Sequence, residues 1–260
     1  LVGSEMCIRD REFMAALMTS VVEMPNKVAE YISVCRQMGI QILPPDINHG
    51  MYGFSVDNGA IRYALSAIKS IGRPVIEGIV REREEHGEYT SLKTFVERNI
   101  DQINKRVVEN LIKAGALDCL EGNRKQKMTI YTQIIDSINQ DKKHTMAGQL
   151  SLFDIASEED KKEFEIRMPQ VEEYPKEIIL TFEKEVLGIY LSGHPLERYR
   201  NMMEKMISAK TSDFQPDDET GIPEVYDNQK VIVGGMITDK TIKYTKTVSY
   251  THLTLPTKLE

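Results

Sequence analysis

Two short glycine-bearing turns, each set between segments of helical period, constrain the fold of this chain more than any other feature. The first lies in "IKSIGRPVIEGIV" (residues 68–80) and the second in "LIKAGALD" (residues 111–118). Apolar residues beside both turns recur at three- and four-residue spacing, and a glycine such as Gly115 is typical of a helix end. The pattern predicts helices joined by tight turns.

The same period extends over most of the chain. Apolar spacing predicts two helices within residues 12–39, broken at Met24-Pro25, and two more on either side of a break near residues 192–194. Pro195 suits the first turn of the second of these. Between them, three helices are expected over residues 74–86, 104–115 and about 124–138, the first closed by Gly87 and the second capped by Asn104.

Three segments change to the pattern of strands. "IQILPPDIN" (residues 40–48) is an apolar run stopped by two prolines, and "YGFSVDNGAIRYAL" (residues 52–65) places β-prone arms around Asn58-Gly59, a common hairpin turn. "KVIVGGMITDKTIKYTKT" (residues 230–247) alternates but offers too few partners to close a sheet. The expected class is therefore mainly α with small β elements (α+β).

A polar linker is expected in the middle of the chain. "NQDKKHTMAG" (residues 139–148) and "SEEDKKE" (residues 157–163) are charged, whereas "GQLSLFDI" (residues 148–155) between them is rich in apolar residues. Two interpretations stay open. The stretch is either a recognition peptide, anchored by the Gln149 amide and filling a partner's pocket, or an ordinary element packed into its own domain.

The net charge of −7 is unevenly distributed. Residues 60–127 carry 13 Lys+Arg against 10 Asp+Glu, whereas residues 150–228 carry 9 against 19. A local basic surface can meet phosphate while the acidic half stays away from it. Solvated helical faces produce differences of this size as well.

The first turn has the layout that binds phosphate through backbone N–H groups and a helix N-terminus. Lys69 and Arg73 flank it, and Lys105, Arg106 and Lys113 lie near the second turn. The pattern resembles the helix-hairpin-helix of DNA-binding proteins, although Ser70 stands where that motif usually has its first glycine. A plain helix connection explains each turn equally well, but two copies in tandem favour DNA binding.

The sequence offers little for catalysis. It has no phosphate-binding P-loop, no nucleophile elbow, and three cysteines without metal-ligand spacing. Asp46 has no acidic companion for two-metal chemistry, and the acidic cluster at residues 158–160 is interpreted as solvating charge. Neither a membrane anchor nor a signal peptide is indicated, so a cytoplasmic protein with no membrane partner is expected.

Seven segments together resemble the bacterial DNA polymerase III alpha-subunit family, the replicative C-family polymerases. They follow the family's order over about residues 12–247: "EFMAALMTS", "ILPPDIN", "AIKSIG", "NKRVVENLIKAGALD", "GQLSLF", "EVLGIYLSGHPL" and "VIVGGMIT". The resemblance implies a fragment of a DNA-directed DNA polymerase that joins deoxynucleoside triphosphates to a primer end. The fragment alone is expected to be inactive.

The resemblance also implies a domain order. It gives part of the fingers region (residues 12–66), a tandem helix-hairpin-helix region on duplex DNA (67–140), a linker with a clamp-binding motif (141–170), a helical segment (171–210), and a second linker with the first strands of an OB-fold near single-stranded template (211–247). Residues 1–11 and 248–260 depart from the family and resemble translated adapter sequence, so they are expected to be artefacts.

Site residues follow by position. The implied contacts with the beta sliding clamp are Gln149, Leu150, Ser151, Leu152 and Phe153, and the implied contacts with duplex DNA are Lys69, Ser70, Gly72, Arg73, Lys105, Arg106, Lys113 and Gly115. Other replisome subunits are implied partners. No cofactor is expected in this stretch, because the carboxylates that hold the family's two Mg²⁺ ions, and its N-terminal phosphoesterase-like domain, are expected upstream of residue 12.

Two alternatives from other classes remain. A freestanding, non-enzymatic adaptor would use the tandem hairpins and the peptide to bring a partner to DNA. A purely structural helical protein would bind neither DNA nor clamp.

Overall fold

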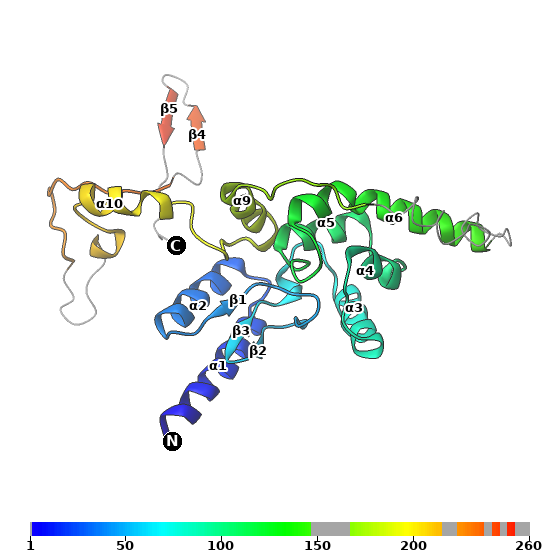
Figure 1. The fold of residues 1–260 in the computed structure, drawn as a ribbon. Coiled ribbons are helices and arrows are strands. Elements are labelled where there is room, and N and C mark those ends of the chain that lie inside the picture. The colour runs from blue at the N-terminus through cyan, green and yellow to red at the C-terminus, as the bar shows by residue number, and fades with distance from the viewer. Residues whose placement is uncertain (1, 147–166, 215–222, 237–240, 245–248, 253–260) are drawn as a thin grey trace. The chain divides into compact units, whose positions relative to one another are not determined.

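A computed structural model describes residues 2–146, 167–214, 223–236, 241–244 and 249–252. The chain divides into two units, residues 1–192 and 193–260, which are described separately. The described α-helices are α1 (Val2–Ser20), α2 (Pro25–Gln37), α3 (Arg73–His86), α4 (Leu92–Asn99), α5 (Lys105–Ala114), α6 (Arg124–Met146), α9 (Lys176–Leu187) and α10 (Arg200–Met206) (Figure 1). The expectation of a mainly helical chain with small β elements is confirmed.

The first unit begins with two helices and a small sheet. Pro25 starts α2, where its missing N–H costs nothing, and Gly39 follows the helix end at φ 73°. Strand β3 (Ala60–Arg62) lies between β1 (Ile42–Leu43), which is parallel to it, and β2 (Ser55–Asp57), which is antiparallel. Asn58 and Gly59 both have positive φ, as a two-residue hairpin turn requires, so the predicted hairpin is confirmed.

One continuous core joins this sheet to the helices that follow. Met18 of α1, Ile61 of β3, Phe95 of α4 and Val108 of α5 are all fully buried within it. The sequence patterns missed α4, a short helix in a polar stretch. Its signal was Ser91, whose hydroxyl caps the helix by accepting a hydrogen bond from the Thr94 N–H at 3.1 Å.

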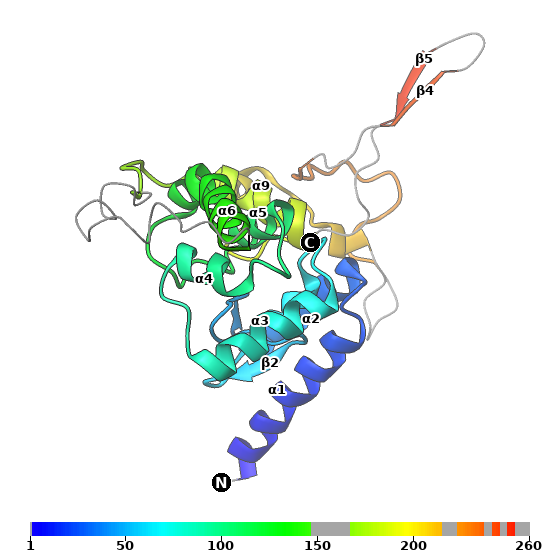
Figure 2. The ribbon, with the colours of Figure 1, turned by 90° about the vertical axis from the view of Figure 1, so that its right-hand side faces the viewer.

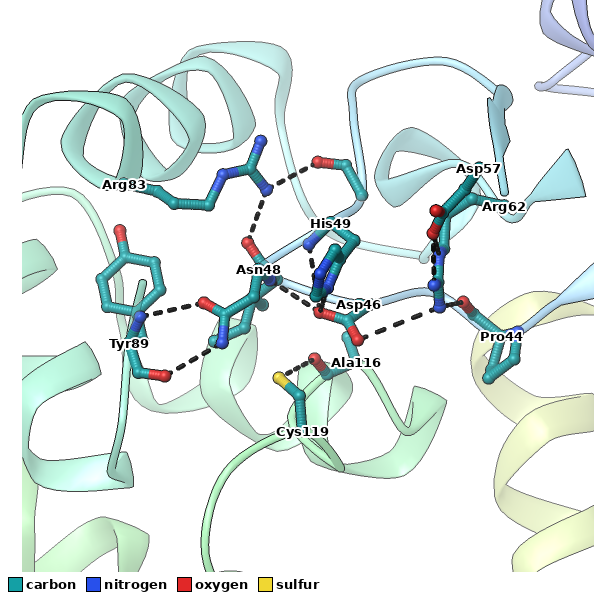
Figure 3. A network of polar contacts seen from close by, with 12 residues as sticks. Pro44, Asp46, Asn48, His49, Asp57, Arg62, Arg83, Tyr89, Ala116 and Cys119 are labelled. Atoms are coloured by element: carbon teal, nitrogen blue, oxygen red, sulfur yellow. Dashed lines mark hydrogen bonds and ion pairs between the residues drawn. The ribbon is translucent and has the colours of Figure 1, made fainter. Parts of the chain in front are cut away.

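Polar side chains hold the "PPDIN" loop (residues 44–48) against this core by hydrogen bonds (Figure 3). The buried guanidinium of Arg83 donates to the carbonyl oxygens of Ile47 and Gly50 at 2.7 and 2.9 Å, and the Asn48 amide forms two hydrogen bonds with the Tyr89 backbone. Asp46 accepts from the N–H groups of Asn48 and His49. Its carboxylate therefore shapes the turn.

Helices α5, α6 and α9 lie side by side in both views (Figure 1 and Figure 2). Asn104 caps α5 as predicted, its side chain accepting from the Val107 N–H at 3.0 Å. The Glu173 carboxylate caps α6 by accepting from the N–H groups of Arg124 and Lys125 at 2.9 and 3.2 Å. Residues just before α9 thus fasten the start of α6, which runs to Met146 rather than to about residue 138.

The second unit differs from the sequence interpretation in two places. A 3₁₀-helix (Glu197–Tyr199) precedes α10, so Pro195 lies in the turn before it and not in a first helical turn. Residues 229–236 form no strand. Ile232 links them to Ser208: its carbonyl accepts from the Ser208 N–H at 3.0 Å and its N–H donates to the Ser208 hydroxyl at 2.8 Å. A strand needs backbone partners along its whole length.

The predicted strand segment, residues 230–247, does contain a strand further along the chain. Strand β4 (Thr241–Tyr244) pairs antiparallel with β5 (Ser249–His252). Strand β5 falls within the range expected to be an artefact, and a two-stranded hairpin does not define an OB-fold. Both the OB-fold and the domain limits therefore stay predictions. No helix in the described ranges is long and apolar enough to cross a membrane.

Candidate nucleic-acid interface

The first turn joins a 3₁₀-helix (Leu65–Ala67) to α3. Ser70 has φ 66°, a left-handed conformation that glycine adopts without cost. Gly72 then takes an extended conformation as the N-cap of α3, and Arg73 is the first helical residue. The turn thus has the backbone path of a hairpin even though a serine replaces the usual glycine.

The second turn is closed by different means. Gly115 ends α5 at φ 80°, and its N–H donates to the Ile112 carbonyl at 3.0 Å. A Cβ at this position would overlap the Arg124 guanidinium, which is paired with Asp118 at 2.7 Å. The Gly115 N–H is therefore used within the fold, and this glycine allows the close approach of Arg124.

Five of the predicted DNA contacts lie around one hollow of about 480 Å³. Lys69 and Ser70 come from the first turn, and Lys105, Arg106 and Lys113 come from α5. The remaining lining residues are Glu109, Asn110, Glu185 and Val186. The fold therefore brings together cations that are about forty positions apart in the sequence.

Three predicted contacts are not among the lining residues: Gly72, Arg73 and Gly115. Arg73 is exposed, pairs with Glu77 at 2.7 Å and lies over the Tyr52 ring at 4.8 Å. Hydrogen bonding to Glu77 raises the pKa of Arg73 above its already high value, so it is always charged. The predicted clamp contacts, residues 149–153, lie outside the described residues.

Lys113 is enclosed by acceptors. Its ammonium lies 2.8 Å from the Glu185 carboxylate and 3.0 Å from that of Glu109, and its side chain is 13% exposed. Burial lowers the pKa of Lys113, but the hydrogen bonds to Glu185 and Glu109 outweigh it and raise the pKa above its ordinary value. Lys113 is therefore charged at any physiological pH.

Sequence reasoning missed the two carboxylates of the hollow. Glu109 stands four residues before Lys113 on the same helix, a spacing that predicts their ion pair. Glu185 lies 72 positions from Lys113 on α9, and no local pattern links the two. Only the packing of α9 on α5 reveals that the Glu185 carboxylate enters the site.

A possible metal cluster in the described ranges lies elsewhere, on α3. Glu82, Glu85 and His86 could offer ligand atoms within 4.8 Å of one another. Glu82 is already paired with Arg98 at 3.0 Å, and its 3.0 Å contact with His86 follows from their i,i+4 spacing. Helical surface pairing accounts for this arrangement.

Comparison with known proteins identifies both the motif and its relatives. A family model described as "Helix-hairpin-helix motif" matches residues 39–127. The chain is 38% identical over 207 residues to the DNA polymerase III subunit alpha of Vibrio cholerae, and 35% identical over 208 residues to that of Escherichia coli K12. The corresponding subunit of Borreliella burgdorferi is 36% identical over 197 residues.

These matches cover much of this chain and little of the relatives. They include 75–79% of the residues here but only 17–18% of the relatives' length. The resemblance seen in seven short segments is thus confirmed over most of the chain. The same matches favour the polymerase interpretation over a freestanding adaptor.

Proposed function

We propose that this chain, which is related over most of its length to DNA polymerase III alpha subunits, holds duplex DNA through sequence-independent phosphate contacts and docks a sliding clamp. The observation that supports the DNA-binding part is the shared hollow, where Lys69 of the first turn lies with Lys105, Arg106 and Lys113 of α5, the helix that precedes the second turn. Contacts to phosphate position a protein on DNA without reading its bases.

The chemistry of synthesis belongs to the whole polymerase in this proposal. DNA-directed synthesis from deoxynucleoside triphosphates, the two Mg²⁺ ions and the contacts with other replisome subunits are assigned to that larger protein. This chain supplies part of the fingers, the phosphate contacts with DNA and the clamp peptide at residues 149–153. On its own it extends no primer.

The salt dependence of DNA affinity tests the proposed phosphate contacts. The whole chain is titrated against two short duplexes of unrelated sequence while salt is raised from about 50 to 200 mM. Each phosphate that the protein neutralises releases counterions. The logarithm of the binding constant should therefore fall linearly with the logarithm of the salt concentration, and the slope should steepen by about 0.9 for each phosphate contact. Equal affinities and equal slopes for the two sequences support the proposal, whereas salt-independent or sequence-dependent binding contradicts it.

A further inference from the structure

The four cations of the hollow are not equivalent. Lys69 is bonded to the end of α9: its ammonium donates to the Glu185 carbonyl at 2.7 Å, and its N–H donates to the Val186 carbonyl at 2.9 Å. Its own carbonyl accepts from the Asn110 amide at 2.7 Å. Lys69 therefore fastens the first turn to the end of α9.

Lys105 and Lys113 also have protein partners. Lys105 pairs with Asp136 of α6 at 2.7 Å, and both of these side chains are about half exposed. Lys113 is held between Glu109 and Glu185, with the Phe182 ring 5.6 Å from its ammonium. An incoming phosphate would have to compete with a carboxylate for either lysine.

Arg106 differs from these three lysines. It is exposed in the first turn of α5, and among the described residues none forms a hydrogen bond or ion pair with its side chain. A guanidinium presents paired N–H donors in a plane that matches two phosphate oxygens. Arg106 is thus a lining cation for which no described residue competes with an incoming phosphate.

Glu185 is placed to respond to that phosphate. Its side chain is 55% exposed, whereas that of Lys113 is 13% exposed, so the carboxylate can swing into solvent while the ammonium stays in place. Carboxylate and phosphate are both anionic acceptors and compete for the same donor. Removing the Glu185 charge would also reduce repulsion of any phosphate bound by Arg106.

We propose that the hollow is a site for a single backbone phosphate, in which Arg106 makes the direct contact and Glu185 is a resident carboxylate that the phosphate displaces from Lys113. This inference rests on the proposed function and deepens it. In this site Arg106 binds the phosphate directly, whereas the lysines keep protein partners. Glu185, near the end of α9, then helps to set the affinity for DNA.

Charge-matched variants of the whole chain test the two roles. Arg106→Gln is compared with Arg81→Gln, which removes the same charge from an exposed position of α3 outside the hollow. Glu185→Gln is compared with Glu177→Gln at the opposite end of α9. Affinity for a short duplex is measured at low salt, and the melting temperature of each variant checks that it is folded.

Arg106→Gln should weaken binding about tenfold and reduce the salt slope by about one phosphate contact, well beyond the effect of Arg81→Gln. Glu185→Gln should tighten binding several-fold more than Glu177→Gln does, because it removes one of the two carboxylate charges that compete with phosphate for Lys113. Equal effects of the two arginine variants, or of the two glutamate variants, would overturn the inference while leaving DNA binding intact. A wild-type chain that binds no duplex would instead overturn the proposed function.

Discussion

Ser70 occupies a backbone conformation that costs a serine free energy. Its φ of 66° brings the Cβ close to the backbone, a strain of about 1–2 kcal/mol that glycine avoids. The helix-hairpin-helix pattern usually has glycine at this position, and the positive φ gives the physical reason. The glycine of the pattern therefore reflects the left-handed backbone conformation at this position. The backbone hydrogen bonds of the neighbouring Lys69 hold Ser70 in that conformation.

Ser70→Gly should raise the free energy of unfolding by about 0.5–1 kcal/mol, because relief of the strain exceeds the extra entropy of an unfolded glycine. Ser70→Ala is the matched control, since it removes the hydroxyl but keeps the Cβ. Urea unfolding measures both. The explanation fails if the two variants unfold at the same urea concentration.

Lys127 is a second residue whose environment is unusual. It is fully buried, and its ammonium donates to the carbonyl oxygens of Leu120 and Gly122. Burial lowers its pKa from the ordinary 10.5, with the nearby Asp118 opposing that shift. The side chain thus closes the loop before α6 at the cost of burying a charge.

Lys127→Met should lower stability at neutral pH by about 1–3 kcal/mol, because two carbonyl groups lose their donor. Between the lowered folded pKa and 10.5 the unfolded chain binds more protons than the folded one, so the wild type gains stability as pH rises. The difference between the two proteins should therefore widen from pH 7 towards pH 10 in thermal melts. A difference that stays constant or narrows would contradict this reasoning.

Local signals predicted α5 and the β2–β3 hairpin well, although α4 was missed despite its Ser91 cap. The Asn104 cap and Gly115 bracket α5 as expected, and Asn58-Gly59 turns the β2–β3 hairpin. Prediction was only partly right where tertiary partners decide. The alternating segment at residues 230–247 contains strand β4, but its first part, residues 230–236, forms no strand because the described residues offer it no continuous partner.

Alanine substitutions at two turn glycines can separate the cost of a left-handed backbone conformation from the cost of a clash with a neighbouring side chain. Gly59 and Gly115 have φ of 82° and 80°, but a Cβ at Gly59 would meet open space whereas one at Gly115 would overlap the Arg124 guanidinium. Gly59→Ala should cost about 1 kcal/mol. Gly115→Ala should cost at least twice as much, because it also disturbs the Arg124–Asp118 ion pair.

Chemical denaturation of both variants measures these costs. Arg124→Gln in the Gly115→Ala background provides the check, since it removes the planar ion pair that the new Cβ would disturb. The additional cost of Gly115→Ala should then shrink. Equal losses for Gly59→Ala and Gly115→Ala would show that conformation alone sets the penalty.

At the scale of the whole molecule, the candidate site could be predicted only in part. The sequence indicated its cations, because lysine and arginine cluster beside two glycine turns. It could not reveal that Lys69 and Lys113 also bind the end of α9, since Glu185 lies beyond the linker and joins the site only through packing. The cations that the sequence predicted thus form a site in which some are paired with carboxylates and Arg106 has no such partner among the described residues.

The clamp-docking proposal depends on residues 149–153, so its test is a binding measurement. The whole chain is titrated with purified bacterial sliding clamp, beside a Leu152→Ala/Phe153→Ala variant. Loss of two apolar anchors should cost several kcal/mol, on the order of a hundredfold in affinity. Because the anchors are apolar, added salt should weaken clamp binding less than DNA binding.

A control variant removes two exposed apolar side chains elsewhere in the chain. Met202 and Met206 are 52% and 60% exposed on α10, so Met202→Ala/Met206→Ala tests whether exposed apolar side chains bind the clamp non-specifically. This control should bind as the wild type does, and the peptide variant should retain its DNA affinity because the hollow is untouched. If the peptide variant binds the clamp as tightly as the wild type, Leu152 and Phe153 serve their own domain instead.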